Sequence, residues 1–288
     1  MSQLRLLVAE SAPPSSREER RRSAGQSQGE SYLDALRAVV PGATLDQIFP
    51  ADDGEVLPDR DALAGYDGIF LTGSPLHLYD DKPEVRRLVD FMRDVFDSGT
   101  PSFGSCAGLQ LAVVAAGGSV RSMGDGREAG FARRVTACAG AADHPLLDGR
   151  PPAFDVPAIY SDQVERLPEG ATAIAGNSVT PVLAAEIRCG EGIFWGVQYH
   201  PELSLREVAA ALRREGDELI EQGFAADRAA LDAHADRIDA LHRAPDRRDL
   251  AWQLGLDDQV TDPDKRRREL ANFVAHRVRP IRAARGRE

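Results

Sequence analysis

A short apolar run that ends in Gly-Ser-Cys-Ala-Gly constrains the fold of this chain most. The run covers residues 101–108, and a helical pattern follows from 109 to 116. A reactive side chain on a tight turn between a strand and a helix needs small neighbours, which Gly104 and Gly108 supply. Cys106 would then lie at a helix N-terminus, where unpaired N–H groups favour thiolate over thiol. The motif predicts a nucleophile, although a buried structural cysteine beside a glycine turn fits the motif alone equally well.

The segment from 192 to 202 decides between these two interpretations. It is an apolar strand that ends in His200, Pro201 and Glu202. Proline keeps its own φ fixed and disfavours the helical region for the residue before it, so this end should be extended, with side chains i and i+2 on one face. Glu202 can then orient the His200 ring while the other ring nitrogen faces the cysteine. His-Pro-Glu alone is typical of a surface turn, but the two motifs together indicate a triad of Cys106, His200 and Glu202.

Two further segments complete a family pattern. They are residues 68–75 with Tyr79 and Asp80 after them, and residues 126–130. Two segments described above belong to the same pattern: the turn around Cys106, a nucleophile elbow that is followed by Gln110, and the strand that ends in His-Pro-Glu. The four segments together span roughly residues 4 to 202. Over this range the chain resembles the class I (triad-type) glutamine amidotransferase domain, as in the amidotransferase half of GMP synthetase and its free-standing relatives.

The resemblance implies roles for residues beside the proposed triad. The backbone N–H groups of Gly73 and Ala107 would form the oxyanion hole, and Gln110 would contact the glutamine substrate, with no metal or cofactor required. One segment departs from the family. Where relatives usually carry a histidine-containing segment before Asp-x-Val, this chain reads Tyr-Ser-Asp-Gln-Val at 160–164. The departure affects the expected acceptor or partner specificity rather than the chemistry.

The order of apolar runs predicts an α/β fold, a flavodoxin-like three-layer α/β/α arrangement around a mixed, mainly parallel sheet. Residues 10–30 break all periodicity and are expected to be a loop, preferably a disordered insertion at 11–30 and alternatively a mobile lid. Asp81 is expected to cap a helix that Pro83 opens, with Met92 and Phe96 in the core. Strands are expected at 4–9, 43–49 and 66–72, a helix is expected at 31–40, and the helix that Pro83 opens is expected to end at Gly99. Antiparallel strands are expected near 119–137, 154–160, 171–175, 181–187 and 192–198.

After Glu202 the sequence becomes helical and highly charged. Ser204 and Glu207 form a capping box, and further helices are expected at 227–241, 247–254 and 266–277. The expected organisation is therefore an amidotransferase-like domain at 1–204, a helical insertion at 205–262, and a terminal helix and tail at 263–288. The insertion is expected to cover a sheet edge or support a homodimer. The sharper hypothesis is that it docks an acceptor enzyme or shapes a pocket for a larger γ-glutamyl substrate.

Composition excludes several classes of function. The 288 residues include 46 acidic and 35 basic side chains, a formal charge of -11, which argues against nucleic-acid and anionic-membrane partners. No apolar run is long enough to span a membrane and the N-terminus is no signal peptide, so a cytoplasmic location is expected.

Three cysteines without Cys-x-x-Cys spacing predict neither a disulfide framework nor a zinc site, and Cys138 and Cys189 are interpreted as bystanders. His144 is a weak rival for the catalytic base. His77 lies near the Gly73 turn and could contact the substrate, but the preferred interpretation is a solvated loop histidine.

The sequence leaves three functions open. The first is a glutaminase that releases ammonia through a Cys106 thioester, for a separate acceptor enzyme because the chain has no P-loop. The second is a γ-glutamyl hydrolase or peptidase that acts on a larger γ-glutamyl amide and needs no partner. The third is a non-catalytic regulatory or binding relative, which an intact Cys106, His200 and Glu202 argues against.

Overall fold

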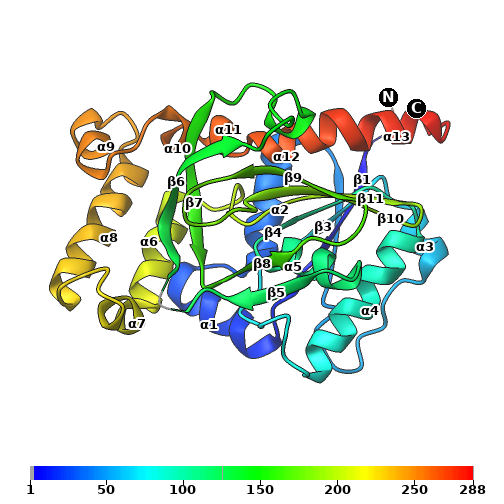
Figure 1. Ribbon diagram of the computed structural model, residues 1–288, viewed down its shortest axis with the longest axis horizontal. Coiled ribbons are helices and arrows are strands. Elements are labelled where there is room, and N and C mark those ends of the chain that lie inside the picture. Colours follow the sequence, from blue (N-terminus) through cyan, green and yellow to red (C-terminus); the bar gives the residue numbers. More distant parts are fainter. Residues whose placement is uncertain (1–2, 125, 288) are drawn as a thin grey trace.

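The computed structural model describes residues 3–124 and 126–287, which fold around a nine-stranded mixed sheet (Figure 1). The strand order is β2-β1-β3-β4-β11-β10-β9-β6-β7, and a separate pair joins β5 to β8. The strands are β1 (Arg5–Ala9), β2 (Thr44–Ile48), β3 (Gly68–Leu71), β4 (Ser102–Ser105), β5 (Ser119–Ser122), β6 (Glu128–Ala137), β7 (Ala153–Tyr160), β8 (Asp162–Arg166), β9 (Ala171–Gly176), β10 (Ala184–Cys189) and β11 (Gly192–Val197).

The pairings from β2 across to β11 are parallel, and those from β11 to β7 are antiparallel. The predicted mixed α/β sheet is therefore confirmed. Strand β11 pairs with β4 in a register that places Gly196 opposite Gly104 and Val197 opposite Ser105. The carboxyl ends of these two parallel strands consequently lie side by side, which brings the segments after Ser105 and Val197 to one edge of the sheet.

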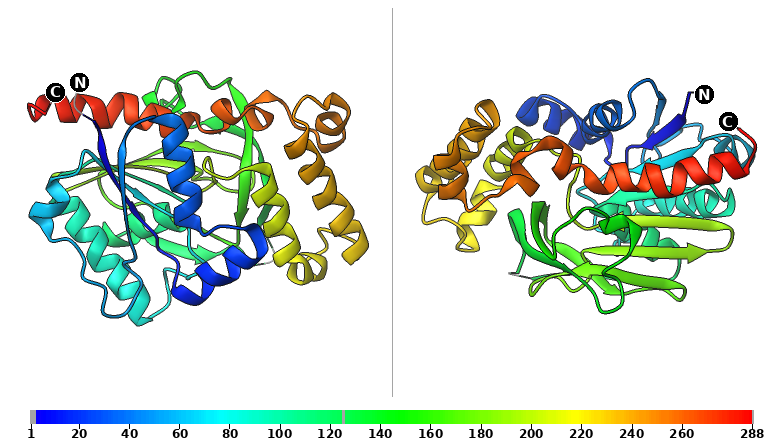
Figure 2. Two further views of the ribbon diagram at one scale, coloured as in Figure 1. Left: turned by 180° about the vertical axis from the view of Figure 1, so that it is seen from behind. Right: turned by 90° about the horizontal axis from the view of Figure 1, so that it is seen from above.

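Helices cover both faces of the sheet. One face packs against α2 and the terminal α12–η2 helix, and the other packs against α3, α4 and α5. Figure 2 shows α2 across the face of the sheet that is turned away from the viewer in Figure 1. The helices are α1 (Pro14–Ala24), α2 (Gln28–Val39), α3 (Arg60–Ala64), α4 (Pro83–Asp97), α5 (Ala107–Ala115), η1 (Pro145–Leu147), α6 (Leu205–Arg214), α7 (Gly216–Glu221), α8 (Arg228–Arg243), α9 (Arg248–Leu254), α10 (Asp258–Thr261), α11 (Pro263–Arg266), α12 (Arg268–Phe273), η2 (Val274–Val278) and α13 (Arg279–Ala284).

The expected loop at 11–30 is wrong, because most of it forms α1 and the start of α2. Helix α1 begins at a proline in its first turn and ends at Gly25, which has a φ of 90°. It buries Arg17 and Arg20 rather than a stripe of apolar side chains. Arg17 forms a two-pronged ion pair with Asp52, at 2.7 and 2.6 Å. Because charged pairs from distant residues hold α1 in place, hydrophobic periodicity could not reveal it.

The helix boundaries differ from expectation in two further places. Helix α2 begins three residues earlier than expected, because Ser27 and Glu30 form a capping box. Helix α4 is preceded by Lys82, which makes no side-chain cap, so the expected Asp81 cap is wrong. Asp81 instead pairs with Arg86 at 2.7 Å. Met92 and Phe96 are buried in the core as expected.

The segment 205–262 forms α6 to α10 beside β6 and the edge strand β7 (Figure 1). Its apolar faces share a core with Phe131 of β6 and Ile159 of β7, so this segment packs onto the sheet edge. The predicted helices at 227–241 and 247–254 are present as α8 and α9. The terminal helix extends beyond the predicted end through the π-helical η2 to α13. Within the described residues, no helix has the length and apolarity to cross a membrane.

Candidate active site

The turn between β4 and α5 places Cys106 in a conformation that side chains rarely adopt. Cys106 has a φ of 54° and a ψ of -114° and directly precedes the first residue of α5. Two close backbone approaches explain the flanking glycines. A Cβ on Gly104 would lie 2.7 Å from the carbonyl carbon of Gly108, and a Cβ on Gly108 would lie 2.6 Å from the carbonyl oxygen of Leu71. The sequence therefore folds here as the predicted sharp elbow.

The strand beside this elbow delivers His200 and Glu202. The backbone N–H of His200 donates to the Pro157 carbonyl at 2.8 Å, which fixes the chain just after β11. Its ring Nδ1 lies 2.7 Å from Glu202 Oε1. The Cys106 side chain interacts with the same ring, and all three side chains are buried. The structure thus brings together the three residues that the sequence singled out.

The charge state of His200 follows from its two partners. Burial alone would disfavour the imidazolium, but the Glu202 carboxylate and the Cys106 sulfur outweigh it and raise the pKa of His200 to about 10. The ring is therefore protonated at neutral pH. An imidazolium beside the sulfur stabilises a thiolate, which is the nucleophilic form of cysteine.

A buried hydrogen-bond network supports the carboxylate. Glu202 Oε2 accepts a hydrogen bond from the Ser105 hydroxyl at 3.0 Å, and the Tyr32 hydroxyl lies 2.6 Å from Ser105 Oγ. Burial raises the pKa of Tyr32 well above 10, so this phenol keeps its proton. Sequence reasoning missed both residues. Ser105 precedes the cysteine and could have been noticed, whereas Tyr32 lies on α2 and carries no local signal.

The residues carried over from the family also surround Cys106. A Cβ on Gly73, just after β3, would lie 3.1 Å from His200 Cε1 and 3.6 Å from Cys106 Cβ. Ala107 is the first residue of α5. Gln110 donates from Nε2 to the carbonyl oxygen of Asp162 at 3.0 Å and to Gln198 Oε1 at 3.1 Å. Its side chain is thereby fixed on the cavity wall.

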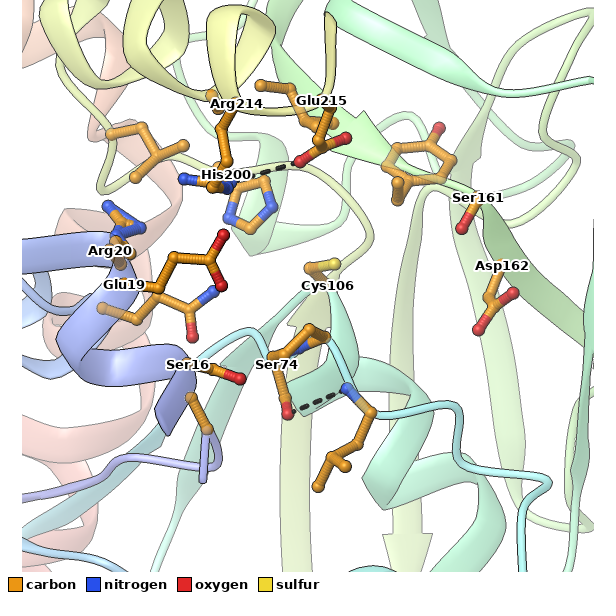
Figure 3. Close-up of a pocket in the computed structure, with 18 of the residues that line it drawn as sticks. Ser16, Glu19, Arg20, Ser74, Cys106, Ser161, Asp162, His200, Arg214 and Glu215 are labelled. Atoms are coloured by element: carbon orange, nitrogen blue, oxygen red, sulfur yellow. Dashed lines mark hydrogen bonds and ion pairs between the residues drawn. The ribbon is translucent and has the colours of Figure 1, made fainter. Parts of the chain in front are cut away.

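Cys106 opens into a cavity of about 550 Å³ (Figure 3). Figure 3 shows Ser16, Glu19 and Arg20 of α1 on one side of Cys106 and Ser161 and Asp162 on the other. His200 lies on the α1 side, and residues of α6 and α7 close the cavity above it. Residues 160–162, the first part of the segment that departs from the family, therefore line this cavity. The sequence placed the segment 11–30 here only as the alternative of a mobile lid, and the segment 205–262 only as the sharper hypothesis of a substrate pocket.

The rival residues lie in different surroundings. His144 lies 3.4 Å from Glu186 and packs against Trp195, and it does not line the cavity. His77 does line the cavity, and its Nδ1 lies 2.6 Å from Asp162 Oδ2. Cys138 and Cys189 are free thiols that take no part in the cavity wall. Over residues 3–124 and 126–287, no group of three or more histidine, cysteine or acidic side chains is arranged to hold a metal ion.

The chain belongs to the class-I glutamine amidotransferase family. The family model for glutamine amidotransferase class-I matches residues 36–218. A γ-glutamyl-L-1-hydroxyisopropylamide hydrolase from a Pseudomonas species is 39% identical over 226 residues, which cover 77% of this chain and 76% of that enzyme. The glutamine-hydrolysing GMP synthase of Nitrosomonas eutropha is 38% identical over 144 residues, which are 48% of this chain and 25% of the synthase.

Solved structures show the same fold. A glutamine amidotransferase from Thermotoga maritima superposes with a TM-score of 0.62 at 19% sequence identity, covering 91% of this chain and the whole of that one. At this identity the likeness concerns the arrangement of the sheet and its helices. The α/β architecture deduced from the apolar runs is thus shared with amidotransferases of known structure.

Proposed function

We propose that this chain is a cysteine hydrolase of γ-glutamyl amides that are larger than glutamine. The observation that carries the proposal is the cavity of about 550 Å³, which the chain's own helices α1, α6 and α7 wall on the His200 side of Cys106. A cavity of this size takes a ligand with groups on both sides of the scissile bond. The similarity to a hydrolase named for a γ-glutamyl amide supports the same substrate class.

The site supports a two-step mechanism. The Cys106 thiolate attacks the γ-carbonyl carbon, forming a C–S bond while the carbonyl electron pair moves to oxygen, which the N–H groups of Gly73 and Ala107 hold. The C–N bond then breaks as His200 gives its proton to the leaving nitrogen, and the amine departs. Water, losing a proton to His200, attacks the γ-glutamyl thioester, and glutamate leaves as the thiolate is restored. Glu202 orients the ring throughout.

A second candidate is an amidotransferase that passes ammonia from glutamine to a separate synthetase subunit. The match to GMP synthases favours it, because those enzymes are named as glutamine-hydrolysing. The matched segment, however, spans only about a quarter of each synthase. The two candidates share the site and differ in what leaves from the γ-carbonyl, an amine or ammonia.

Product analysis separates them. The purified chain is incubated alone with glutamine and with γ-glutamyl isopropylamide or γ-glutamyl 1-hydroxyisopropylamide, and glutamate and the released amine are quantified. The proposed function predicts a higher kcat/KM for at least one substituted amide than for glutamine, without any partner. Turnover of glutamine alone, raised by adding a synthetase, would instead establish the second candidate.

A further inference from the structure

Glu10 is a buried carboxylate of which only one oxygen accepts hydrogen bonds. It directly follows β1, at the same edge of the sheet as Cys106, and is fully buried. Its Oε2 accepts hydrogen bonds from the Ser27 hydroxyl at 3.0 Å and from Gln47 Nε2 at 2.8 Å. No donor in the described part of the chain reaches its Oε1. A buried polar atom without a partner costs free energy, so this oxygen calls for a ligand that donates a hydrogen bond.

The unpaired oxygen belongs to the catalytic cavity. Glu10 and Gln28 both line the cavity that contains Cys106 and His200. Gln28 Oε1 is likewise buried and receives no hydrogen bond from any described residue. The Gln28 amide lies beside Gly73, where an added Cβ would be 3.4 Å from Gln28 Nε2 and 3.1 Å from His200 Cε1. Gln28 therefore lies close to His200 and Cys106, and Glu10 lies against the next residue of α2, because a Cβ on Gly29 would be 2.5 Å from Glu10 Oε2.

The mechanism determines which half of a substrate reaches this side. The leaving nitrogen must face His200, because that ring gives it a proton. His200 lies on the α1 side of Cys106 in Figure 3, whereas Ser161 and Asp162 lie on the opposite side. The amine half of a γ-glutamyl amide is consequently directed toward α1 and α2, and the glutamyl half toward Asp162.

We infer that Glu10 and Gln28 form a subsite that binds a hydroxyl group on the amine half of the substrate. This inference rests on the proposed function. A hydroxyl group donates one hydrogen bond, which the open oxygen of Glu10 accepts, and the amide of Gln28 offers a second polar contact. A γ-glutamyl amide of an amino alcohol meets these requirements, and the name of the related Pseudomonas hydrolase describes such a compound. Ammonia and a plain alkylamine would leave the carboxylate oxygen unpaired.

Two substrates of nearly equal shape test the subsite. The kcat/KM values for γ-glutamyl 1-hydroxyisopropylamide and γ-glutamyl isopropylamide are compared, since the two differ by one hydroxyl group. A site built around a hydroxyl group discriminates strongly against the analogue that lacks it. A hydrogen bond to a charged acceptor predicts a preference of about 10- to 100-fold for the hydroxyl compound.

Glu10→Met removes the acceptor at similar length. It should lower kcat/KM for the hydroxyl compound by about 10- to 100-fold relative to the isopropylamide, so that the preference disappears. The matched control is Glu18→Gln, an exposed α1 residue outside the cavity wall, which should keep the preference. If Glu10→Met does not fold, as judged by circular dichroism, Gln28→Met decides, because it keeps Glu10 with its two donors and should also reduce the preference.

The outcomes distinguish this inference from the proposed function. Equal wild-type rates on the two amides, or variants that slow both amides and glutamine to the same extent, would overturn the subsite while leaving the hydrolase intact. A wild-type chain that cleaves glutamine but neither amide would overturn the proposed function itself.

Discussion

The reactive centre and the helices that cover it are built in opposite ways. His200 and Glu202 are two residues apart, and Cys106 lies on a turn between consecutive elements. The helices that wall the cavity, α1, α6 and α7, are instead held by contacts between distant residues. Arg20 of α1, for example, lies 2.7 Å from Glu207 of α6, which is 187 positions away in the sequence. The comparison teaches that the chemistry is encoded in short motifs, whereas the shape of the cavity depends on long-range pairing.

Glu207 is the centre of that long-range pairing. It closes the capping box of α6 with Ser204 and accepts hydrogen bonds from Ser31 and from Gln26, the latter at 3.1 Å. Burial opposes its charge, but Arg20 and the hydrogen bonds from Ser31 and Ser204 outweigh it and lower the pKa of Glu207 to about 2. One carboxylate therefore joins α1, α2 and α6.

The largest expected effect is in the reactive centre. Cys106→Ala should reduce glutamate release by about 10⁴-fold or more, because it removes the proposed nucleophile. Thermal melting should show a folded protein. Cys138→Ala and Cys189→Ala, which replace thiols outside the cavity wall, should keep full activity. Activity that survives in Cys106→Ala would contradict the mechanism.

Glu202→Gln should reduce kcat by about 100-fold, because the ring loses its orienting charge. It should also change the pH profile. Since the pKa of His200 is raised to about 10, the imidazolium is lost only as the pH rises through that value, and kcat/KM should fall there. Without the carboxylate the pKa of His200 drops, so this alkaline limb should move to lower pH. An alkaline limb that stays in place would show that Glu202 does not set the charge of the ring.

Glu207→Ala tests the cover. It leaves the buried Arg20 unpaired, which should destabilise the protein by about 3 kcal/mol and lower its Tm by roughly 10 °C. The displaced α1 should cost about 10-fold in kcat/KM for a substituted amide and less for glutamine. Asp34→Ala, which removes an exposed pair with Arg37, is the matched control and should change stability by at most about 0.5 kcal/mol. An equal loss of kcat/KM for the substituted amide and for glutamine would contradict the idea that the helices around the cavity act on substrate selection rather than on the chemistry.

The smallest expected effect is at Tyr32 of α2, which contacts the hydrogen-bond network around Glu202. Tyr32→Phe removes the hydroxyl that lies 2.6 Å from Ser105 Oγ and should reduce kcat by about 5-fold, the value of one neutral hydrogen bond. Because Tyr32 acts through Ser105 and Glu202, KM should stay the same. A change in KM without a change in kcat would assign Tyr32 to substrate binding instead.

The limits of sequence reasoning follow the same division. Gly104 and Gly108 could be interpreted because close backbone approach demands glycine, and His200 and Glu202 because proline fixes the backbone between them. Helix α1 could not be predicted, since its buried residues are arginines whose partners lie far along the chain. The unpaired oxygen of Glu10 was equally hidden, because only the folded structure shows which donors reach a carboxylate.

The positive φ of Cys106 lowers the stability of the fold at the position of the proposed nucleophile. A side chain held at a φ of 54° costs about 1 to 3 kcal/mol, and glycine at that position would avoid most of this cost. The hydrogen bond from Cys106 N–H to the Val197 carbonyl, at 2.8 Å, is one of the contacts that keep the strained turn in place. Selection for thermal stability alone would therefore tend to replace the sulfur atom of the proposed nucleophile. Laboratory evolution of a more heat-resistant variant is best screened for hydrolysis at every round.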